Sequence, residues 1–205
     1  FVPSSGCYIL SSDYSQIELR IFAHLAGIES LKNAFLENLD IHTKTASDIY
    51  GVPISEVTSN MRRSAKAVNF GIIYGISSYG LASDLNISVK DAKNFIDAYF
   101  QTFPGIKTYM DKAIQEAHEV GYVKTIMGRK RVIDELNNSN YMIRSMGERM
   151  ALNTPIQGSS ADILKKAMIE IDQKFEEFNL KSKMILQIHD ELVFNVYDTE
   201  LDEVK

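Results

Sequence analysis

The stretch from Arg62 to Gly75 constrains this chain more than any other part of its sequence. Residues spaced by four form one slowly drifting stripe on an α-helix, which advances about 100° per residue. Here that stripe consists of Arg62, Lys66, Phe70 and Tyr74. A second face gathers small and apolar side chains that suit burial: Ala65, Val68, Ile72 and Ile76. The stretch therefore predicts a helix that packs on a core along one face and presents two cations and then two aromatic rings along the other.

A stripe of this composition suits a nucleoside triphosphate. A cation on a long stem reaches phosphate oxygens, and a flat ring stacks on the face of a base. Aromatic side chains at helical spacing are also common in cores, and surface cations are often only solvated, so the stripe alone leaves both explanations open. Gly71 and Gly75 favour a binding site, because a glycine inside a helix costs about 1 kcal/mol relative to alanine and suits a place where another group approaches closely.

Composition is that of an ordinary soluble globular protein. The chain has 205 residues, 45% of them hydrophobic and 24% charged. No apolar run approaches the roughly 20 residues of a membrane span, so we expect no membrane partner. The one cysteine, Cys7, excludes an internal disulfide and fits a reducing, cytoplasmic compartment. The net charge of −5 argues only weakly against nucleic-acid binding, because the cations cluster locally, around Arg62 and around Arg129.

Local patterns predict a helical middle of about 120 residues between two strand-bearing ends. Strands are expected at 7–13, 184–189 and 192–196, with a small hairpin over 122–134. Helices are expected over about 15–26, 29–39, 41–50, 62–75, 88–102, 104–121 and 141–178, the last of them interrupted at Pro155 and Gly158. Capping boxes at Ser15 and Ser88 support two of the helix starts. The pattern predicts an α+β fold in which the chain ends form one small sheet.

Carboxylates stand at two of the predicted strand ends. Asp190 and Glu191 form an unusual hairpin turn, since a two-residue turn favours Asn-Gly or Asp-Gly. A solvated acidic turn is the ordinary explanation; the alternative is that stability is given up to present an anion. If both strands share a sheet, Asp13 and Asp190 lie close together, and such a pair needs a cation or a proton. Mg²⁺, which combines one or two carboxylates with substrate phosphates, suits that position.

Three segments together resemble motifs A, B and C of family A DNA polymerases, the bacterial DNA polymerase I type. The run from Asp13 to Arg20 (DYSQIELR) resembles motif A, and Gln187 to Leu192 (QIHDEL) resembles motif C. The Arg62–Gly75 helix, with its Arg-x3-Lys-x3-Phe-x3-Tyr-Gly spacing, resembles motif B. The motifs occur in the family's order, and the resemblance covers essentially the whole chain.

The resemblance implies a metal site for two Mg²⁺ ions. Asp13 and Asp190 match the two metal-binding aspartates, and the backbone carbonyl of Tyr14 completes a metal shell. Glu191 is a third acid of the same motif. Two ions about 3.5–4 Å apart would stabilise the attacking and leaving oxygens of an in-line phosphoryl transfer.

The resemblance also implies a nucleotide site on and near the Arg62–Gly75 helix. Lys66 additionally acts as a general acid on the leaving pyrophosphate, Phe70 packs on the incoming sugar and base, and Tyr74 guards the templating position. Glu18 matches a steric gate against a ribose 2′-hydroxyl; it also fits a capping-box role with Ser15, and a tyrosine contact can share it. The implied nucleotide-binding residues are Gln16, Glu18, His42, Arg62, Lys66, Phe70 and Tyr74.

A further set of residues matches contacts to primer-template DNA. Arg149, Asn153 and Gln157 follow one another at helical spacing; such a stripe is ordinarily a solvated face, but the resemblance assigns it to the duplex. His189 resembles the histidine beside the primer end. The implied DNA-binding residues are Ser78, Tyr79, Arg149, Asn153, Gln157 and His189.

The implied architecture is an incomplete polymerase right hand: a small antiparallel palm sheet with a large, mostly helical fingers insertion. The predicted domains are palm over 1–21, fingers over 22–140 and palm again over 141–205, with the thumb and an exonuclease-like domain outside the chain. The expected activity is two-metal transfer of deoxynucleotides to a primer 3′ end in DNA replication and repair. We expect a monomer in the bacterial cytoplasm, associated with the nucleoid through DNA and weakly active without the thumb.

Three other functions use parts of the same pattern. A single-subunit RNA polymerase would need room where the bulky Glu18 stands. A two-metal nuclease would use Asp13 and Asp190 but has no use for the stripe from Arg62 to Tyr74. A helical DNA-binding module would keep the motifs without binding a deoxynucleoside triphosphate in the presence of Mg²⁺.

Overall fold

The computed structural model describes residues 2–205, and Phe1, which the predicted first palm segment includes, lies outside them. The chain forms two compact units, one of Phe1–Ile17 with Ser159–Lys205 and one of Glu18–Gly158. The units divide at 17/18 and 158/159, whereas the predicted domains divide at 21/22 and 140/141. We call them the sheet unit and the helical unit, and each is described by itself.

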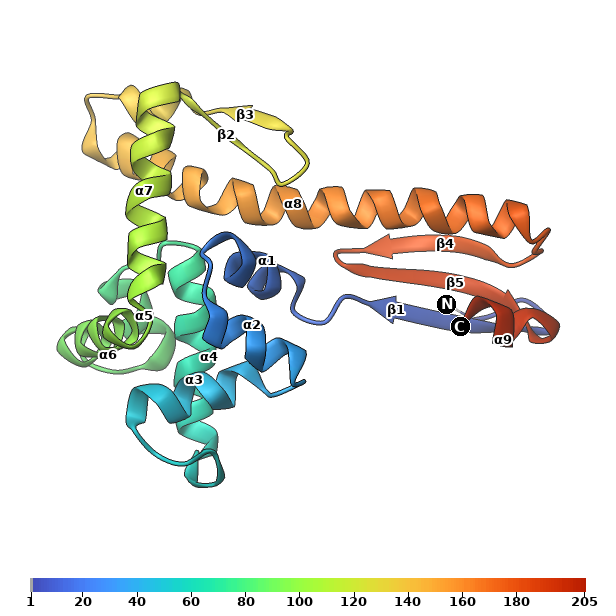
Figure 1. Cartoon of the computed structure of the whole chain (residues 1–205), viewed down its shortest axis with the longest axis horizontal. Coiled ribbons are helices and arrows are strands. Elements are labelled where there is room, and N and C mark those ends of the chain that lie inside the picture. The colour runs from blue at the N-terminus through green and yellow to red at the C-terminus, as the bar shows by residue number, and fades with distance from the viewer. Residues whose placement is uncertain (1) are drawn as a thin grey trace. The chain divides into compact units, whose positions relative to one another are not determined.

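Within residues 2–205, the sheet unit is built on three antiparallel strands in the order β1-β5-β4 (Figure 1). They are β1 (Cys7–Asp13), β4 (Lys183–Ile188) and β5 (Glu191–Tyr197). Alternate residues of the central strand β5 are apolar and buried: Leu192, Phe194 and Val196. Because side chains alternate between the two faces of a strand, Glu191 lies on the opposite face. One face of the sheet therefore forms a core, and the other carries polar groups such as Glu191 together with the buried Val193.

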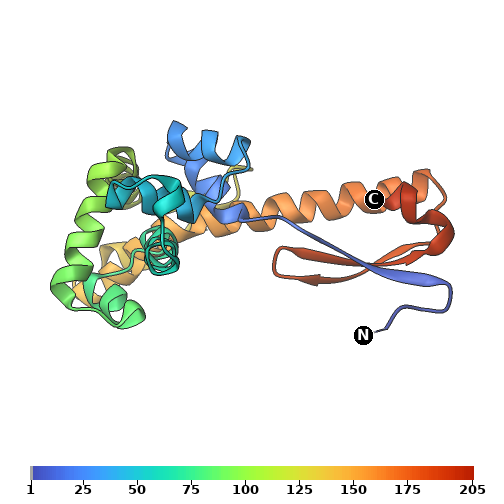
Figure 2. The same ribbon diagram turned by 90° about the horizontal axis from the view of Figure 1, so that it is seen from below.

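A helix covers the core face of that sheet. The part of α8 (Tyr141–Glu177) that belongs to this unit lies beside β4 and β5 in both views (Figures 1 and 2). Its Leu164 is 2% exposed and joins the β5 side chains in one apolar cluster, with Met168 and Phe175 packed against it. The chain continues from β5 through η3 (Asp198–Glu200) into α9 (Leu201–Val204).

The helical unit is a sequence of short helices and one hairpin. Its elements are α1 (Ile17–Leu25), α2 (Glu29–Leu36), α3 (Ile41–Tyr50), η1 (Ile54–Glu56), α4 (Ser59–Ile73), α5 (Ser78–Leu85), α6 (Val89–Thr102), α7 (Pro104–Val120), β2 (Tyr122–Lys124), β3 (Lys130–Val132), η2 (Asp134–Asn137) and the first half of α8. Side chains cap four of the helix starts: Asp40, Thr58, Ser77 and Ser88. Such caps satisfy backbone N–H groups that a helix leaves without an internal partner.

Three of the four residues predicted for the buried face of α4 lie there, whereas the fourth, Ile76, lies beyond the end of the helix and is half-buried. Ala65, Val68 and Ile72 are at most 2% exposed. A second cluster joins α7, the hairpin, η2 and the first half of α8 through Ala117, Val123, Ile133, Leu136 and Ala151. Among residues 2–205, none of the helices combines the length and the apolar character that crossing a membrane requires.

The bounds of α4 differ from the prediction. The helix begins at Ser59 rather than Arg62, because Thr58 accepts a hydrogen bond from the Met61 N–H at 3.3 Å and caps an earlier turn. It ends at Ile73, and Gly75 lies beyond it with φ 68°, a conformation that glycine adopts without a steric penalty. The prediction that Gly75 lies inside the helix was therefore wrong.

The predicted interruption of the long helix was also wrong, because α8 runs through Pro155. An interior proline costs about 3 kcal/mol. Burial of Leu152 and Ile156 on either side offsets that cost, at about 1.5–3 kcal/mol for each large apolar side chain. Side chains from the hairpin region add hydrogen bonds: Arg131 Nη1 donates to Thr154 Oγ1, and Arg129 Nη2 to the Gly158 carbonyl, both at 3.0 Å.

The turn between β4 and β5 is shifted by one residue from the prediction. Ile188 pairs with Glu191, so the two turn residues are His189 and Asp190, and Glu191 begins β5. His189 has φ 55°, which is uncommon for residues other than glycine. This turn contains no glycine, and the register of β5 against both neighbouring strands determines the position of the turn.

Candidate functional site

Two strand ends of the sheet unit bring the predicted carboxylates together. In the β1–β5 register, Asp13 is the partner of Glu191, and Asp190 precedes Glu191 in the turn. The Tyr14 N–H donates to the Asp190 carbonyl at 3.4 Å, which extends the pairing one step beyond Asp13. Asp13 and Asp190 thus stand at adjacent strand ends although 177 residues separate them in sequence.

Neighbouring polar groups hold the turn and its third acid. Ser11 donates a hydrogen bond from Oγ to Glu191 Oε1, on the sheet face that carries Asp13. Gln187 Nε2 donates to the His189 carbonyl at 3.1 Å and so braces the turn. Since one Glu191 oxygen is already engaged, this carboxylate is less free to bind a cation than that of the exposed Asp13.

The donor set at these strand ends fits Mg²⁺. Among residues 2–205 no group of three or more His, Cys, Asp or Glu side chains is gathered at one point. Mg²⁺ is ordinarily held by one or two carboxylates together with substrate phosphates and water, so a full protein cage is not required. Asp13 and Asp190 could supply the carboxylates, with the Tyr14 carbonyl as an additional oxygen donor.

On the helical unit, the α4 stripe is exposed at its cations and half-buried at its rings. Arg62 and Lys66 are exposed, and Phe70 and Tyr74 are intermediate. A cavity of about 650 Å³ is lined by three stripe residues, by other residues of α4, by the α4–α5 turn and α5, and by one residue of α8: Arg63, Lys66, Ala67, Phe70, Gly71, Tyr74, Gly75, Ile76, Ser77, Gly80, Asp84 and Arg149. The group that approaches Gly71 closely is the side chain of Ile76. A Cβ added at Gly71 would lie only 2.6 Å from Ile76 Cγ2.

Tyr74 joins two other predicted site residues. Its hydroxyl donates to Glu18 Oε2, which confirms the expected tyrosine contact of Glu18. Glu18 lies in the first turn of α1. A cap at Ser15 predicts that this helix begins at Gln16, but it begins one residue later, at Ile17. Burial, together with the Glu18 carboxylate, raises the pKa of Tyr74 to about 12, although a hydrogen bond with Gln157 acts the other way. Tyr74 is therefore a neutral donor that fixes the Glu18 carboxylate.

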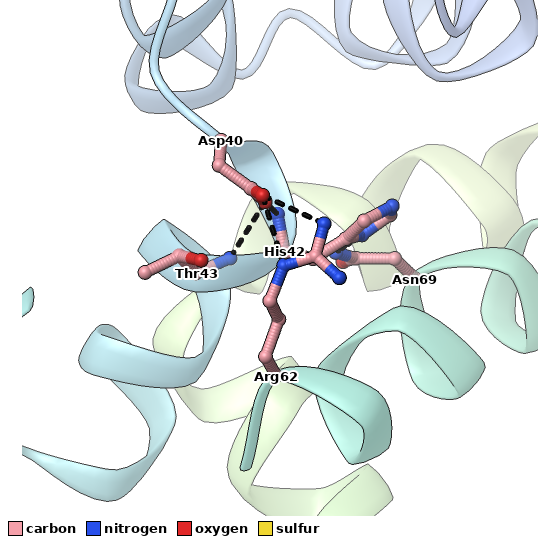
Figure 3. A network of polar contacts seen from close by, with 5 residues as sticks. All are labelled: Asp40, His42, Thr43, Arg62 and Asn69. Carbon is pink, nitrogen blue, oxygen red and sulfur yellow. Dashed lines mark hydrogen bonds and ion pairs between the residues drawn. The ribbon is translucent and has the colours of Figure 1, made fainter. Parts of the chain in front are cut away.

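Arg62 is held by an acid that the sequence did not assign to the site, Asp40 (Figure 3). Nε and Nη2 of Arg62 lie 2.9 and 2.7 Å from Asp40 Oδ2. Oδ1 of the same carboxylate accepts from the N–H groups of His42 and Thr43 and caps α3. Burial alone would raise the pKa of Asp40, but the hydrogen bonds from Arg62, Thr43 and His42 and the guanidinium charge together lower it.

The His42 side chain is buried between α3 and α4. Its Nδ1 lies 3.1 Å from Asn69 Nδ2, and its ring centroid lies 5.7 Å from that of Phe70. Burial lowers the pKa of His42; Arg62 and Lys66 also lower it, while Asp40 opposes them. This arrangement places His42 beside Phe70 of the α4 stripe.

Two other residues that were predicted to contact nucleotide or DNA each have a buried side-chain oxygen atom without a hydrogen-bond partner within residues 2–205. They are Oε1 of Gln16 and Oδ1 of Asn153. A buried polar atom without a partner costs about 1–3 kcal/mol, which a bound ligand could recover. Arg149 packs near Gly75, and Tyr79, at the start of α5, is 74% exposed.

Asp40 and Asn69 are the main site residues that the sequence reasoning missed. Asn69 is 1% exposed on the apolar face of α4, where a polar side chain requires a partner. Asp40 stands directly before α3, as helix caps do. Both signals were present in the sequence, but neither identifies the partner side chain.

With this geometry established, comparison with known proteins identifies the family. A family model, DNA polymerase family A, matches residues 1–205. The chain belongs to this family. The α+β class, with a small antiparallel sheet and a mostly helical insertion, is thereby confirmed.

Individual relatives cover all or nearly all of this chain. It is 54% identical over 205 residues to DNA polymerase I of Bacillus caldotenax, covering 100% of this chain and 23% of the relative. It is 54% identical over 203 residues to DNA polymerase I of Bacillus subtilis (strain 168), covering 98% and 23%. The chain thus spans about a quarter of the length of these relatives.

A solved structure is similar to the whole chain. It is described as the POL domain of Pol1 from M. smegmatis in complex with DNA primer-template and dNTP. Its sequence is 45% identical, the TM-score is 0.95, and the likeness covers 100% of this chain and 36% of that chain. This partial coverage of a polymerase domain agrees with the incomplete right-hand architecture.

Proposed function

We propose that this chain is the palm and fingers segment of a DNA-templated DNA polymerase, which transfers deoxynucleotides to a primer 3′ end in DNA replication and repair. Family membership supports the class of enzyme. The observation that carries the proposal is the β1–β5 register, because it sets Asp13 and Asp190 at adjacent strand ends.

In this proposal the sheet unit holds two Mg²⁺ ions. Asp13, Asp190 and the Tyr14 carbonyl would bind them, and Glu191, one of whose oxygens accepts from Ser11, contributes less. When bound, the ions supply charge stabilisation to the oxygens of the phosphoryl transfer. The two carboxylates orient the ions, and the backbone pairing of the strands holds the carboxylates.

The helical unit binds the deoxynucleoside triphosphate in this proposal. Arg62 and Lys66 bind phosphate oxygens through charge-assisted hydrogen bonds, and Lys66 also donates a proton to the leaving pyrophosphate. Phe70 packs on the sugar and base. Glu18, fixed by Tyr74, excludes the ribose 2′-hydroxyl, and His42 completes the nucleotide contacts of this unit. Gln16 of the sheet unit is a further proposed nucleotide contact.

Primer-template DNA is the proposed macromolecular partner. The similar M. smegmatis structure contains DNA primer-template and dNTP. Orphaned Asn153 Oδ1 suits a base edge, and exposed Tyr79 suits stacking. The proposed DNA contacts are Ser78, Tyr79, Arg149, Asn153, Gln157 and His189.

Primer extension tests the function. The segment replaces the corresponding residues of full-length Bacillus subtilis DNA polymerase I, and we call this chimera the host polymerase. We expect Mg²⁺-dependent extension with deoxynucleotides and little with ribonucleotides. Equal use of ribonucleotides would favour the RNA polymerase, degradation without extension would favour the nuclease, and DNA binding without Mg²⁺-dependent nucleotide binding would favour the helical module.

A further inference from the structure

A buried polar network joins α3 to α4 behind the stripe. His42, Thr45 and Asn69 are 4%, 0% and 1% exposed. Asn69 Nδ2 lies 3.1 Å from His42 Nδ1 and 3.1 Å from Thr45 Oγ1, and Asn69 Oδ1 accepts from Thr45 Oγ1 at 3.3 Å. Figure 3 shows His42 and Asn69 side by side next to Arg62.

The orientation of the Asn69 amide indicates which nitrogen of His42 carries the proton. An amide NH₂ group has two hydrogens and only donates, so Asn69 Nδ2 can serve both Thr45 Oγ1 and His42 Nδ1. His42 Nδ1 must then accept, and in a neutral imidazole the hydrogen stands on Nε2. A protonated His42 would direct an N–H of its own at the Asn69 N–H, which is repulsive.

Within residues 2–205 no hydrogen bond is formed by His42 Nε2, although the Nε2–H is a donor. Arg62 and Lys66 act electrostatically on the ring, and Phe70 lies against it. A neutral donor at this place adds a hydrogen bond to an anion without adding a third positive charge beside two others.

We propose that Asn69 is a positioning residue that holds His42 as a neutral Nε2–H donor toward a phosphate oxygen of the bound triphosphate. The ligand assignment rests on the proposed function, whereas the tautomer does not. Charged groups acting on the ring are Asp40 of the α3 cap and Arg62 and Lys66 of α4. Burial and the two cations lower the pKa of His42 and so favour the neutral ring, whereas the Asp40 carboxylate raises that pKa.

Nitrogen-15 NMR of the histidine rings of the 205-residue chain tests the tautomer directly. We expect His42 to be neutral at pH 7 with the proton on Nε2. Asn69→Asp replaces the donor by an acceptor, so the proton should move to Nδ1 or the ring should become charged. Thr45→Val is the matched control, because it removes the other partner of Asn69 and should leave the His42 tautomer unchanged.

Several outcomes would overturn the proposal: a wild-type His42 that carries its proton on Nδ1, one that is charged at pH 7, or an Asn69→Asp variant with an unchanged tautomer. If Asn69→Asp fails to fold, the wild-type spectrum decides alone. Titration with inorganic tripolyphosphate should shift the His42 Nε2 signal in the wild type and shift it less in Asn69→Asp; an equal shift in both would count against the role of Asn69.

A kinetic measurement in the host polymerase separates this proposal from the function on which it rests. Asn69→Asp should raise KM for deoxynucleotides by about 10- to 100-fold, the equivalent of one hydrogen bond to a charged group, with a smaller change in kcat. A loss confined to kcat would contradict positioning. If the unsubstituted host polymerase extends no primer, the proposed function fails while the NMR result still decides the tautomer.

Discussion

The carboxylates of the sheet unit are positioned mainly by backbone pairing, whereas His42 and Arg62 are positioned by other side chains. Asp13 and Asp190 take their places from the β1–β5 register, and the Asp13 carboxylate is exposed. Arg62 is bound by Asp40, and His42 by the buried Asn69. The first arrangement leaves the Asp13 and Asp190 carboxylates available to the proposed cations, and the second orients Arg62 and His42 without any ligand.

The largest expected effect is at the strand ends. In the host polymerase, Asp13→Ala or Asp190→Ala should reduce extension by about 10³-fold or more, because each removes a ligand from the proposed metal site. Asp202→Ala, an exposed acid of α9, should have little effect. Thermal unfolding of each variant shows whether the fold is retained. Near-normal extension by a folded Asp13→Ala or Asp190→Ala variant would contradict the metal assignment.

A second prediction compares the cations of α4. Lys66→Ala should slow nucleotide incorporation by about 10²-fold, the effect of removing one donor to a developing charge. Arg63→Ala should have an effect about tenfold smaller, since Arg63 is turned about 100° from Arg62 and off the stripe. Both residues line the same cavity, so single-turnover incorporation rates make a close comparison. Equal defects would mean that the phosphate-binding face includes Arg63.

A third prediction concerns the sugar. Glu18→Ala removes the bulk that Tyr74 holds in place, so ribonucleotide use should rise by about 10- to 100-fold while deoxynucleotide use falls less. By the family resemblance, Phe70→Tyr should ease acceptance of nucleotides that lack the 3′-hydroxyl and leave the 2′ selectivity unchanged. Extension with deoxy-, ribo- and dideoxynucleotides distinguishes the two patterns. Unchanged rejection of ribonucleotides by Glu18→Ala would leave Glu18 as a structural residue only.

The sequence predicted what depends on local pattern and on motif spacing. The β1 strand, the buried face of α4, the Ser88 cap of α6 and proline at the start of α7 were all predicted and are present. The position of the β4–β5 turn was missed because pairing with two other strands determines it. The continuity of α8 through Pro155 was missed because distant side chains support it.

The same limit applies to the candidate site. Motif spacing identified Arg62 and the family resemblance identified His42, but Asp40 and Asn69 act through contacts between α3 and α4. Such contacts depend on how two helices pack, which a local pattern does not specify. Residues proposed to bind a ligand could therefore be chosen from motifs and the family resemblance, whereas the side chains that hold Arg62 and His42 required the structure.

A fourth prediction concerns the turn after the stripe. Gly75→Ala should lower the free energy of unfolding by about 1–2 kcal/mol, the cost of a left-handed conformation in a residue with a Cβ. The new Cβ would also lie 3.1 Å from Arg149 Cγ. Gly128→Ala is the matched control, because Gly128 has φ 83° and no atom would lie within 4 Å of its Cβ. Urea denaturation measures both, and a loss in Gly75→Ala no larger than in Gly128→Ala would exclude a contribution from Arg149.

The smallest expected effect comes from the Asp40–Arg62 ion pair. Both side chains are more than 40% exposed, so solvent screening limits its contribution to roughly 0.2–1 kcal/mol. Asp40→Asn removes the charge but keeps a good helix cap, and should cost only that amount at pH 7. Asp40→Ala also removes the cap of α3 and should cost about 1 kcal/mol more.

The pH dependence gives this last prediction its sign. The pKa of Asp40 is lowered in the folded protein, so its ionised form stabilises the fold above the unfolded value near 3.8. That contribution should disappear as the pH falls through the lower folded pKa. Urea denaturation between pH 7 and pH 3 should therefore show wild type and Asp40→Asn converging at the acidic end. A difference between wild type and Asp40→Asn that persists unchanged at low pH would show that it does not come from the ionised Asp40 carboxylate, and so that the ion pair with Arg62 does not account for it.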